Sequence, residues 1–170
     1  MQIYLLRHAV AGMRDPRKYP DDIGRPLTPA GRAKMHTAVR GMVALGLSFD
    51  LILTSPLTRA RQTARIVTRE IKASRPATLL EALAPKGSSG AVLSALSRAG
   101  RADHAESVLL VGHEPGLGRL VSELLVPAPA DISIELKKGG LCRIDVDGEP
   151  QPGSGRLIFL LPPRSLRLMA

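Results

Sequence analysis

The first residues of this chain with chemical potential are Arg7 and His8, and they directly follow an apolar, β-favouring run. A run of this length and composition is typical of a buried strand. In open α/β sheets, ligands bind just beyond the carboxyl ends of the strands. The sequence therefore predicts that an arginine and a histidine lie where such folds carry out chemistry.

Polar side chains follow two further apolar runs in the same way. Ser55 comes directly after the run 49–54, with Arg59 one helical turn later, and His113 follows the run 107–111. We expect these run ends to meet at one edge of a sheet, where two arginines and two histidines would surround one point. Arginine binds phosphate through its planar fork, and histidine attacks phosphorus when neutral or donates a hydrogen bond when protonated. The pattern indicates a phosphate site, and Ser55 is a candidate ligand because helix N-termini bind anions.

Strands that alternate with helices are expected to position these residues. This order predicts a three-layer α/β/α sandwich whose sheet is mostly parallel, with an antiparallel hairpin at the C-terminal end. We expect one domain over residues 1–170, with a polar linker at 100–106 and a short basic tail after Pro163. After the opening strand, the predicted strands are 49–54, 78–80, 107–111, 141–146 and 156–161, and the predicted helices are about 29–46, 57–72, 89–98 and 116–125.

The chain carries a formal net charge of +9, which favours an anionic partner such as a nucleic acid, a membrane surface or a phosphorylated substrate. A solvated basic surface is the alternative, and Arg61, Arg65 and Arg69 fit it as the outer face of one helix. Aromatic residues make up 2% of the chain and no dense basic block occurs, which argues against nucleic-acid binding.

Cys142 is the only cysteine, so the sequence offers no disulfide framework and no thiolate metal site. No carboxylate cluster suggests a metal, and we expect no cofactor. No apolar segment approaches the roughly 18 residues of a membrane span, and no secretory signal is evident. These features predict a cytoplasmic protein that does not enter the membrane.

The three polar run ends resemble the signature of the histidine phosphatase superfamily. Residues 6–9, LRHA, resemble its RHG motif, with Ala9 in place of the usual glycine. Residues 54–63, TSPLTRARQT, match its SPxxRAxQT element, and residues 111–113, VGH, match the element of its second histidine. Further segments and the compact length resemble the SixA branch of phosphohistidine phosphatases in particular; these segments are 25–31, 81–87 and 112–115.

This resemblance implies a role for each candidate and a fold of the phosphoglycerate-mutase type. His8 would be the nucleophile that becomes a phosphohistidine intermediate, which water then hydrolyses without a metal. Arg7, Arg59 and His113 would hold the phosphoryl oxygens and stabilise their charge. Glu81 follows a predicted short strand and is a candidate general acid, although a surface carboxylate or a helix cap is an equal interpretation. Larger members of the superfamily use such an acid to protonate an alkoxide leaving group.

These observations favour a metal-independent phosphatase whose substrate is a phosphohistidine on a protein, such as a phosphorelay or phosphotransfer domain. The short gaps between the motifs predict an open site. One alternative is a phosphatase for a small phosphorylated metabolite or a nucleotide. The other is a catalytically inactive module that binds phosphate or nucleic acid through the positive charge.

Overall fold

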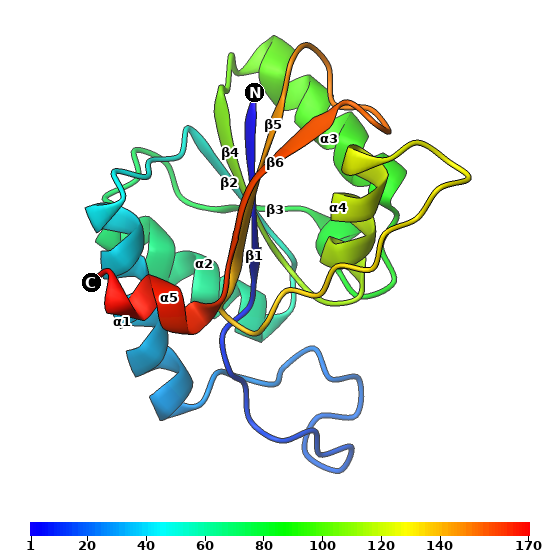
Figure 1. Ribbon diagram of the computed structural model, residues 1–170. Coiled ribbons are helices and arrows are strands. Elements are labelled where there is room, and N and C mark those ends of the chain that lie inside the picture. Colours follow the sequence, from blue (N-terminus) through cyan, green and yellow to red (C-terminus); the bar gives the residue numbers. More distant parts are fainter.

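Six strands form one mixed sheet in the computed structural model, which describes all of residues 1–170 (Figure 1). The four strands β1, β2, β3 and β4 are parallel to one another, whereas β5 runs antiparallel to β1 and β6 antiparallel to β5. This arrangement confirms the predicted sheet and its C-terminal hairpin. The strands lie in the order β3 (Thr78–Leu79), β2 (Leu51–Thr54), β4 (Ser107–Gly112), β1 (Gln2–Arg7), β5 (Leu141–Val146) and β6 (Gly155–Leu161).

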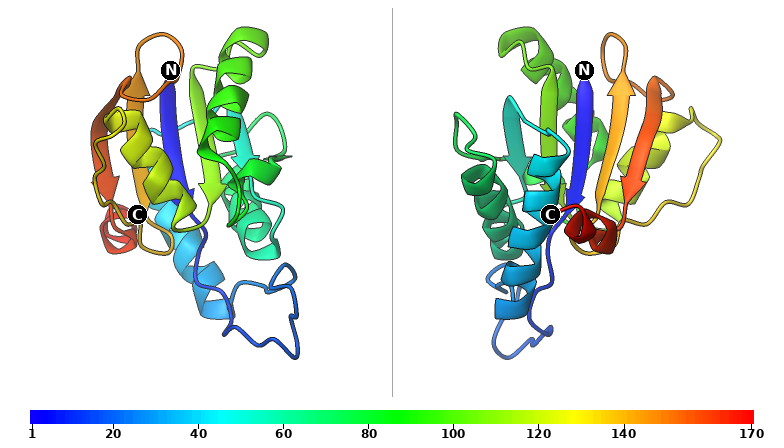
Figure 2. Two further views of the ribbon diagram at one scale, coloured as in Figure 1. Left: turned by 90° about the vertical axis from the view of Figure 1, so that its right-hand side faces the viewer. Right: turned by 60° about the vertical axis from the view of Figure 1, so that its left-hand side comes forward.

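Helices cover both faces of the sheet, which confirms the three-layer sandwich (Figure 2). Helices α1 (Pro29–Ala44), α2 (Thr58–Glu70) and α5 (Pro163–Leu168) lie on one face. Helices α3 (Ser89–Ala102) and α4 (Gly116–Leu125) lie on the other, near the short 3₁₀ helix η1 (Glu81–Leu83). None of these helices combines the length and the apolarity that crossing a membrane requires.

Alternating side chains of the strands build two hydrophobic cores, each of 19 buried residues. In β1, Ile3 and Leu5 belong to the core under α3 and α4, whereas Tyr4 and Leu6 belong to the core under α1 and α2. Because successive strand residues point to opposite faces, a run that is apolar throughout can fill both cores. This is the reason that the central residues of β1, Ile3 to Leu6, are all hydrophobic.

Two helical segments differ from the sequence prediction. Helix α3 continues to Ala102, beyond the predicted end at 98, because Ala99 is buried in the core and the turn that follows closes only at His104, with φ of 50°. The basic tail forms helix α5, which starts at Pro163 and buries Leu166 completely against α1. Proline is favourable at the first helical position, where its missing N–H has no intrahelical partner to lose.

The carboxyl ends of β1, β2 and β4 meet at one edge of the sheet. In the parallel register Arg7 lies opposite Gly112, and Thr54 lies opposite Val111. Backbone hydrogen bonds from the amides of His8 and Ser55 to β4 extend the pairing by one residue on each strand. The side chains that follow all three strands therefore start from neighbouring positions.

Candidate active site

His8 is 5% exposed, directly beyond the end of β1. Its Nδ1 donates a hydrogen bond of 2.7 Å to the carbonyl oxygen of Ala9, and its Nε2 makes no hydrogen bond within the protein. Burial, together with the nearby guanidiniums of Arg59 and Arg7, lowers the pKa of His8 to about 4. A carbonyl can only accept, so Nδ1 carries the proton and Nε2 presents a lone pair. The ring is therefore neutral at pH 7 and its Nε2 is nucleophilic.

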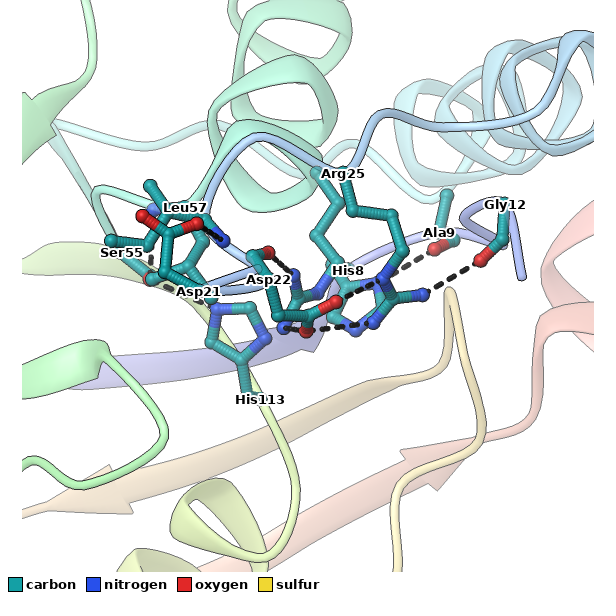
Figure 3. Close-up of polar contacts among 11 residues, drawn as sticks. His8, Ala9, Gly12, Asp21, Asp22, Arg25, Ser55, Leu57 and His113 are labelled. Carbon is teal, nitrogen blue, oxygen red and sulfur yellow. Dashed lines mark hydrogen bonds and ion pairs between the residues drawn. The ribbon is translucent and has the colours of Figure 1, made fainter. Parts of the chain in front are cut away.

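His113 faces His8, with their ring centroids 5.0 Å apart and an interplanar angle of 52° (Figure 3). Its Nε2 is 2.9 Å from Ser55 Oγ, which also accepts a hydrogen bond from the Leu57 amide. The Ser55 hydroxyl is therefore free to donate its proton to Nε2, an arrangement that leaves the proton of the neutral ring on Nδ1. Burial lowers the pKa of His113 to about 3, with further contributions from His8 and Arg59.

Arg59 is 4% exposed in the first turn of α2 and is oriented by Asp22 of the loop between β1 and α1. One terminal nitrogen donates to the Asp22 carbonyl at 2.9 Å, and the other lies 3.1 Å from the Asp22 carboxylate. Arg25 donates two hydrogen bonds of 2.6 and 3.0 Å to the same carboxylate and a third to the Gly12 carbonyl (Figure 3). Asp22 thus ties the loop to Arg59.

Arg7 is oriented from the opposite side by the segment that precedes β5. One terminal nitrogen donates to the Leu136 carbonyl at 2.7 Å and lies 3.5 Å from the Glu135 carboxylate. Glu114 anchors that segment, because its carboxylate accepts hydrogen bonds from the amides of Leu136 and Gly118. A carboxylate with both oxygens occupied by backbone donors is a structural anchor, so Glu114 positions Arg7 through the Leu136 carbonyl.

Three buried nitrogens of these residues have no hydrogen-bond partner in the protein: Arg7 Nε, Arg59 Nε and His113 Nδ1. Buried donors are normally paired, because an unpaired one costs about 1–3 kcal/mol. Here the three unpaired buried nitrogens belong to the last residue of β1, the first turn of α2 and the residue after β4, all at the same edge of the sheet. Three such donors, two of them on guanidiniums, fit the oxygens of a tetrahedral oxyanion beside His8.

The structure brings together five of the six residues that the sequence singled out, namely Arg7, His8, Ser55, Arg59 and His113. Ser55 is fully buried, and both of its hydroxyl contacts are made to protein groups rather than toward open space. Glu81 begins η1, is exposed, and makes no hydrogen bond to any of these side chains.

Sequence reasoning does not identify Asp22 and Arg25 as parts of the site, because both lie in an irregular segment, residues 10–26, that is rich in glycine, proline, aspartate and arginine. The one available signal is the segment 25–31, which resembles the SixA branch but indicates no role for Arg25. Asp22 has φ of 60°, in the left-handed region that aspartate tolerates better than most residues. A local conformation of this kind is set by tertiary contacts and has no periodic pattern in the sequence.

Helix α2 also supplies two contacts that the sequence left unexplained. Thr63 Oγ1 accepts a hydrogen bond from the Ala9 amide at 3.0 Å, and Gln62 Oε1 accepts one from the Leu27 amide at 2.8 Å. These two residues fix the backbone that follows His8 and the backbone that precedes α1. Ala9 itself is buried and has no positive φ, so its methyl group is accommodated in place of a glycine.

Several known proteins resemble this chain in sequence. Residues 3–84 match the family model of the histidine phosphatase superfamily, branch 1. An uncharacterised protein of Picosynechococcus is 40% identical over 141 residues, covering 83% of this chain and 82% of that protein. Phosphohistidine phosphatase SixA of Escherichia coli is 28% identical over 171 residues, covering 99% of this chain and 98% of the relative.

Solved structures extend the similarity to the whole fold. The protein histidine phosphatase SixA complexed with tungstate superimposes with a TM-score of 0.84 at 26% identity, covering 98% of this chain and 99% of that one. An alpha-ribazole-5'-P phosphatase from Escherichia coli superimposes with a TM-score of 0.70 at 22% identity, covering 96% of this chain and 98% of that one, a likeness of fold alone. By sequence and by fold, this chain belongs to the histidine phosphatase superfamily and, within it, to the SixA-like branch.

Proposed function

We propose that the protein is a phosphatase that forms a phosphohistidine intermediate on His8. The observation that carries this proposal is the state of His8, whose Nδ1 is fixed by the Ala9 carbonyl while its Nε2 is unprotonated. The unpaired donors of Arg7, Arg59 and His113 lie around the same ring. A neutral nucleophile surrounded by oxyanion donors is the arrangement that phosphoryl transfer requires.

In the proposed reaction, Nε2 of His8 attacks phosphorus as the bond to the leaving group breaks. Arg7 Nε, Arg59 Nε and His113 Nδ1 donate hydrogen bonds to the phosphoryl oxygens, on which negative charge is distributed during transfer. Water then attacks the phosphorylated imidazole, releases phosphate and restores neutral His8. The same three donors stabilise the charge in both the transfer to His8 and the hydrolysis. We propose that residues 1–170, which contain all of them, act as one domain.

The substrate that we favour is a phosphohistidine on a protein. Two of the comparisons support it by name, the sequence match to SixA of Escherichia coli and the structural match to SixA solved with tungstate, a tetrahedral oxyanion. The chemistry also supports it, because a phosphorylated imidazole releases a better leaving group than an alkoxide and needs less help from an acid. Glu81, the candidate acid, is exposed and hydrogen-bonded to no residue of the site.

A small phosphorylated metabolite remains the second candidate, since the alpha-ribazole-5'-P phosphatase shares the fold. The role of Glu81 separates the two. If the protein acts on phosphohistidine, Glu81→Gln leaves its turnover within about twofold and slows only alkyl phosphates, whose leaving groups need protonation. A uniform loss on all substrates would instead assign Glu81 a role in binding or folding.

The decisive experiment is to trap ³²P-labelled enzyme from a panel of phosphodonors and to compare turnover of a histidine-phosphorylated phosphotransfer domain with that of sugar phosphates. We expect labelling in the native protein and none in His8→Ala. His36→Ala serves as the control, because His36 is a surface residue paired with Glu70. Full activity of His8→Ala would overturn the mechanism, a clear preference for sugar phosphates would overturn the substrate, and no hydrolysis of any donor would favour a binding module.

A further inference from the structure

A basic groove lies along the outer face of α2, between that helix and the edge of the sheet at β3. Its volume is about 550 Å³. Arg61, Arg65 and Arg69 line one wall, and Pro76 and Leu79 form part of the other. Leu79 is 52% exposed and belongs to β3, the last strand at this edge of the sheet. We call this feature the α2 groove.

The three arginines of the α2 groove form a continuous line of unpaired positive charge. They are spaced four residues apart, so they occupy one stripe of the helix that extends over about 12 Å. All three are exposed, and none takes part in any of the protein's salt bridges or side-chain hydrogen bonds. Like charges at this spacing repel one another and weaken a helix, so local helix stability does not explain the stripe.

The α2 groove begins beside the candidate active site. Its lining includes Thr54, which directly precedes Ser55, and Thr58, which directly precedes Arg59. The same first turn of α2 therefore buries Arg59 toward His8 and exposes Arg61 toward the groove. A macromolecule that presents a phosphoryl group to His8 would reach the groove without leaving the surface of the protein.

We propose that the α2 groove docks an acidic helical segment of the phosphoprotein substrate, with carboxylates at every fourth residue opposite Arg61, Arg65 and Arg69. This inference rests on the proposed function, whose substrate it specifies. The repeat of a partner helix matches the repeat of the arginines, because both follow the pitch of an α-helix. Arginine's planar fork is suited to carboxylates, and complementary charge chiefly raises the rate of encounter.

The composition of the α2 groove favours a protein segment over single-stranded nucleic acid. Binding of single strands depends on aromatic side chains on which bases stack, and no aromatic residue lines the groove. The wall opposite the arginines contains apolar residues, which suit the aliphatic part of a docked helix. Tighter binding of single-stranded nucleic acid than of an acidic helix would therefore contradict the proposal.

The first test compares Arg65→Glu with Arg98→Glu. Both change the net charge equally, but Arg98 is an exposed residue of α3, on the opposite face of the sheet. Arg65→Glu should fold, because the new carboxylate lies four residues from Arg61 and from Arg69. We expect it to lower kcat/KM toward a histidine-phosphorylated phosphotransfer domain about fivefold or more at low salt. Turnover of a small aryl phosphate should be unchanged, as should both activities of Arg98→Glu.

The second test does not depend on catalysis. A fluorescein-labelled helical peptide with glutamate at every fourth position should bind the native protein, measured by anisotropy, and bind Arg65→Glu about fivefold more weakly or worse. A matched peptide with glutamine at those positions should not bind, and salt should weaken the glutamate complex.

Together, the two tests distinguish failure of the proposed phosphohistidine substrate from failure of the proposed docking in the α2 groove. If the native protein hydrolyses small phosphates but no phosphohistidine protein, the proposed substrate fails, and the peptide alone decides the groove. Equal loss for Arg98→Glu, unaltered turnover of the protein substrate by Arg65→Glu, or absence of peptide binding would overturn the docking proposal. Preferential binding of single-stranded DNA or tripolyphosphate over the acidic peptide would overturn it as well.

Discussion

At the scale of single residues, the state of His8 depends on one short hydrogen bond and on burial. The Ala9 carbonyl fixes the proton on Nδ1, and burial holds the pKa of the ring at about 4. A solvated histidine would lose its nucleophilic form near pH 6.5. The protein therefore keeps a nucleophile in its reactive form at pH values where a free imidazole would be largely protonated.

The rate of His8 phosphorylation should accordingly be almost constant from pH 8 to about pH 5. Because protonation removes the lone pair of Nε2, the acidic limb attributable to His8 should lie near its lowered pKa of about 4 rather than near 6.5. Single-turnover formation of labelled enzyme, corrected for ionisation of the phosphodonor, measures this profile. A limb centred at pH 6.5 would contradict the inferred state of His8.

Ser55 is better understood as a positioning residue for His113 than as a phosphate ligand. Ser55→Ala removes the partner of Nε2, so the proton of His113 is no longer directed to Nδ1. We expect kcat to fall about tenfold to a hundredfold, less than the ~10²–10³ typical of losing a donor itself. Ser55→Thr, which retains the hydroxyl, should recover much of the loss, and ¹⁵N shifts of the His113 ring should report the change of tautomer. An unchanged ring spectrum in Ser55→Ala would refute this role.

The sequence could predict the residues that follow strands but not the residues that orient them. Arg7, His8 and His113 were predictable because each follows an apolar run, and the topology of parallel sheets then implies convergence. Asp22 and Arg25 were not, since their positions depend on how an irregular loop folds over the sheet edge. Likewise, no pattern indicates that Ser55 bonds to His113 from another strand.

At the scale of elements, helix α2 connects the site to the surrounding loops. Along its inner face Arg59 points to the site, Gln62 holds the amide of Leu27, and Thr63 holds the amide of Ala9. The outer face of the same helix carries the arginines of the α2 groove. One amphipathic helix thus both positions Arg59 at the candidate active site and presents a separate charged surface.

Helix α5 shows how an element can form without a strong sequence signal. It has six residues, too few to be stable alone, and it exists because Leu166 packs against α1. The contact requires Gly41 in α1, since a Cβ there would overlap the carbonyl of Leu166. Periodicity over so short a segment cannot be recognised, and a glycine within a helix signals a close approach only after the partner is known.

Gly41→Ala should therefore destabilise the protein despite the higher helix propensity of alanine. We expect a loss of about 1–3 kcal/mol in the free energy of unfolding, as for other overpacked cores. Urea unfolding measures the loss, and turnover of an aryl phosphate should stay near native because α5 is not part of the site. Gly90→Ala in α3 is the matched control, since its Cβ would make only an ordinary contact of 3.6 Å with Ser88 Oγ, and a gain of up to about 1 kcal/mol is expected. Equal stability of Gly41→Ala and the native protein would show that α5 does not hold its position.

At the scale of the whole molecule, the sheet was predictable because its strands are long apolar runs with clear ends. The strand order places β4 between β1 and β2, and this order brings His113 to His8 and Ser55. What could not be predicted is how deeply this arrangement buries the two histidines. Both histidines are nearly inaccessible to water, so the fold holds them neutral beside two guanidiniums.

This burial makes the stability of the whole protein depend on pH. The pKa values of His8 and His113 are lowered to about 4 and about 3 in the folded protein. Between these values and the ordinary histidine pKa of about 6.5, the unfolded chain therefore binds more protons than the folded one. The stabilisation is complete above about pH 6.5 and is lost as pH falls toward the folded pKa values, by up to about 1.4 kcal/mol per pH unit for each ring. Urea unfolding between pH 7 and pH 4.5 avoids the titration of most carboxylates. The slope of unfolding free energy against pH should fall by about half in His8→Gln, whereas an unchanged slope in His8→Gln would show that His8 is not held neutral.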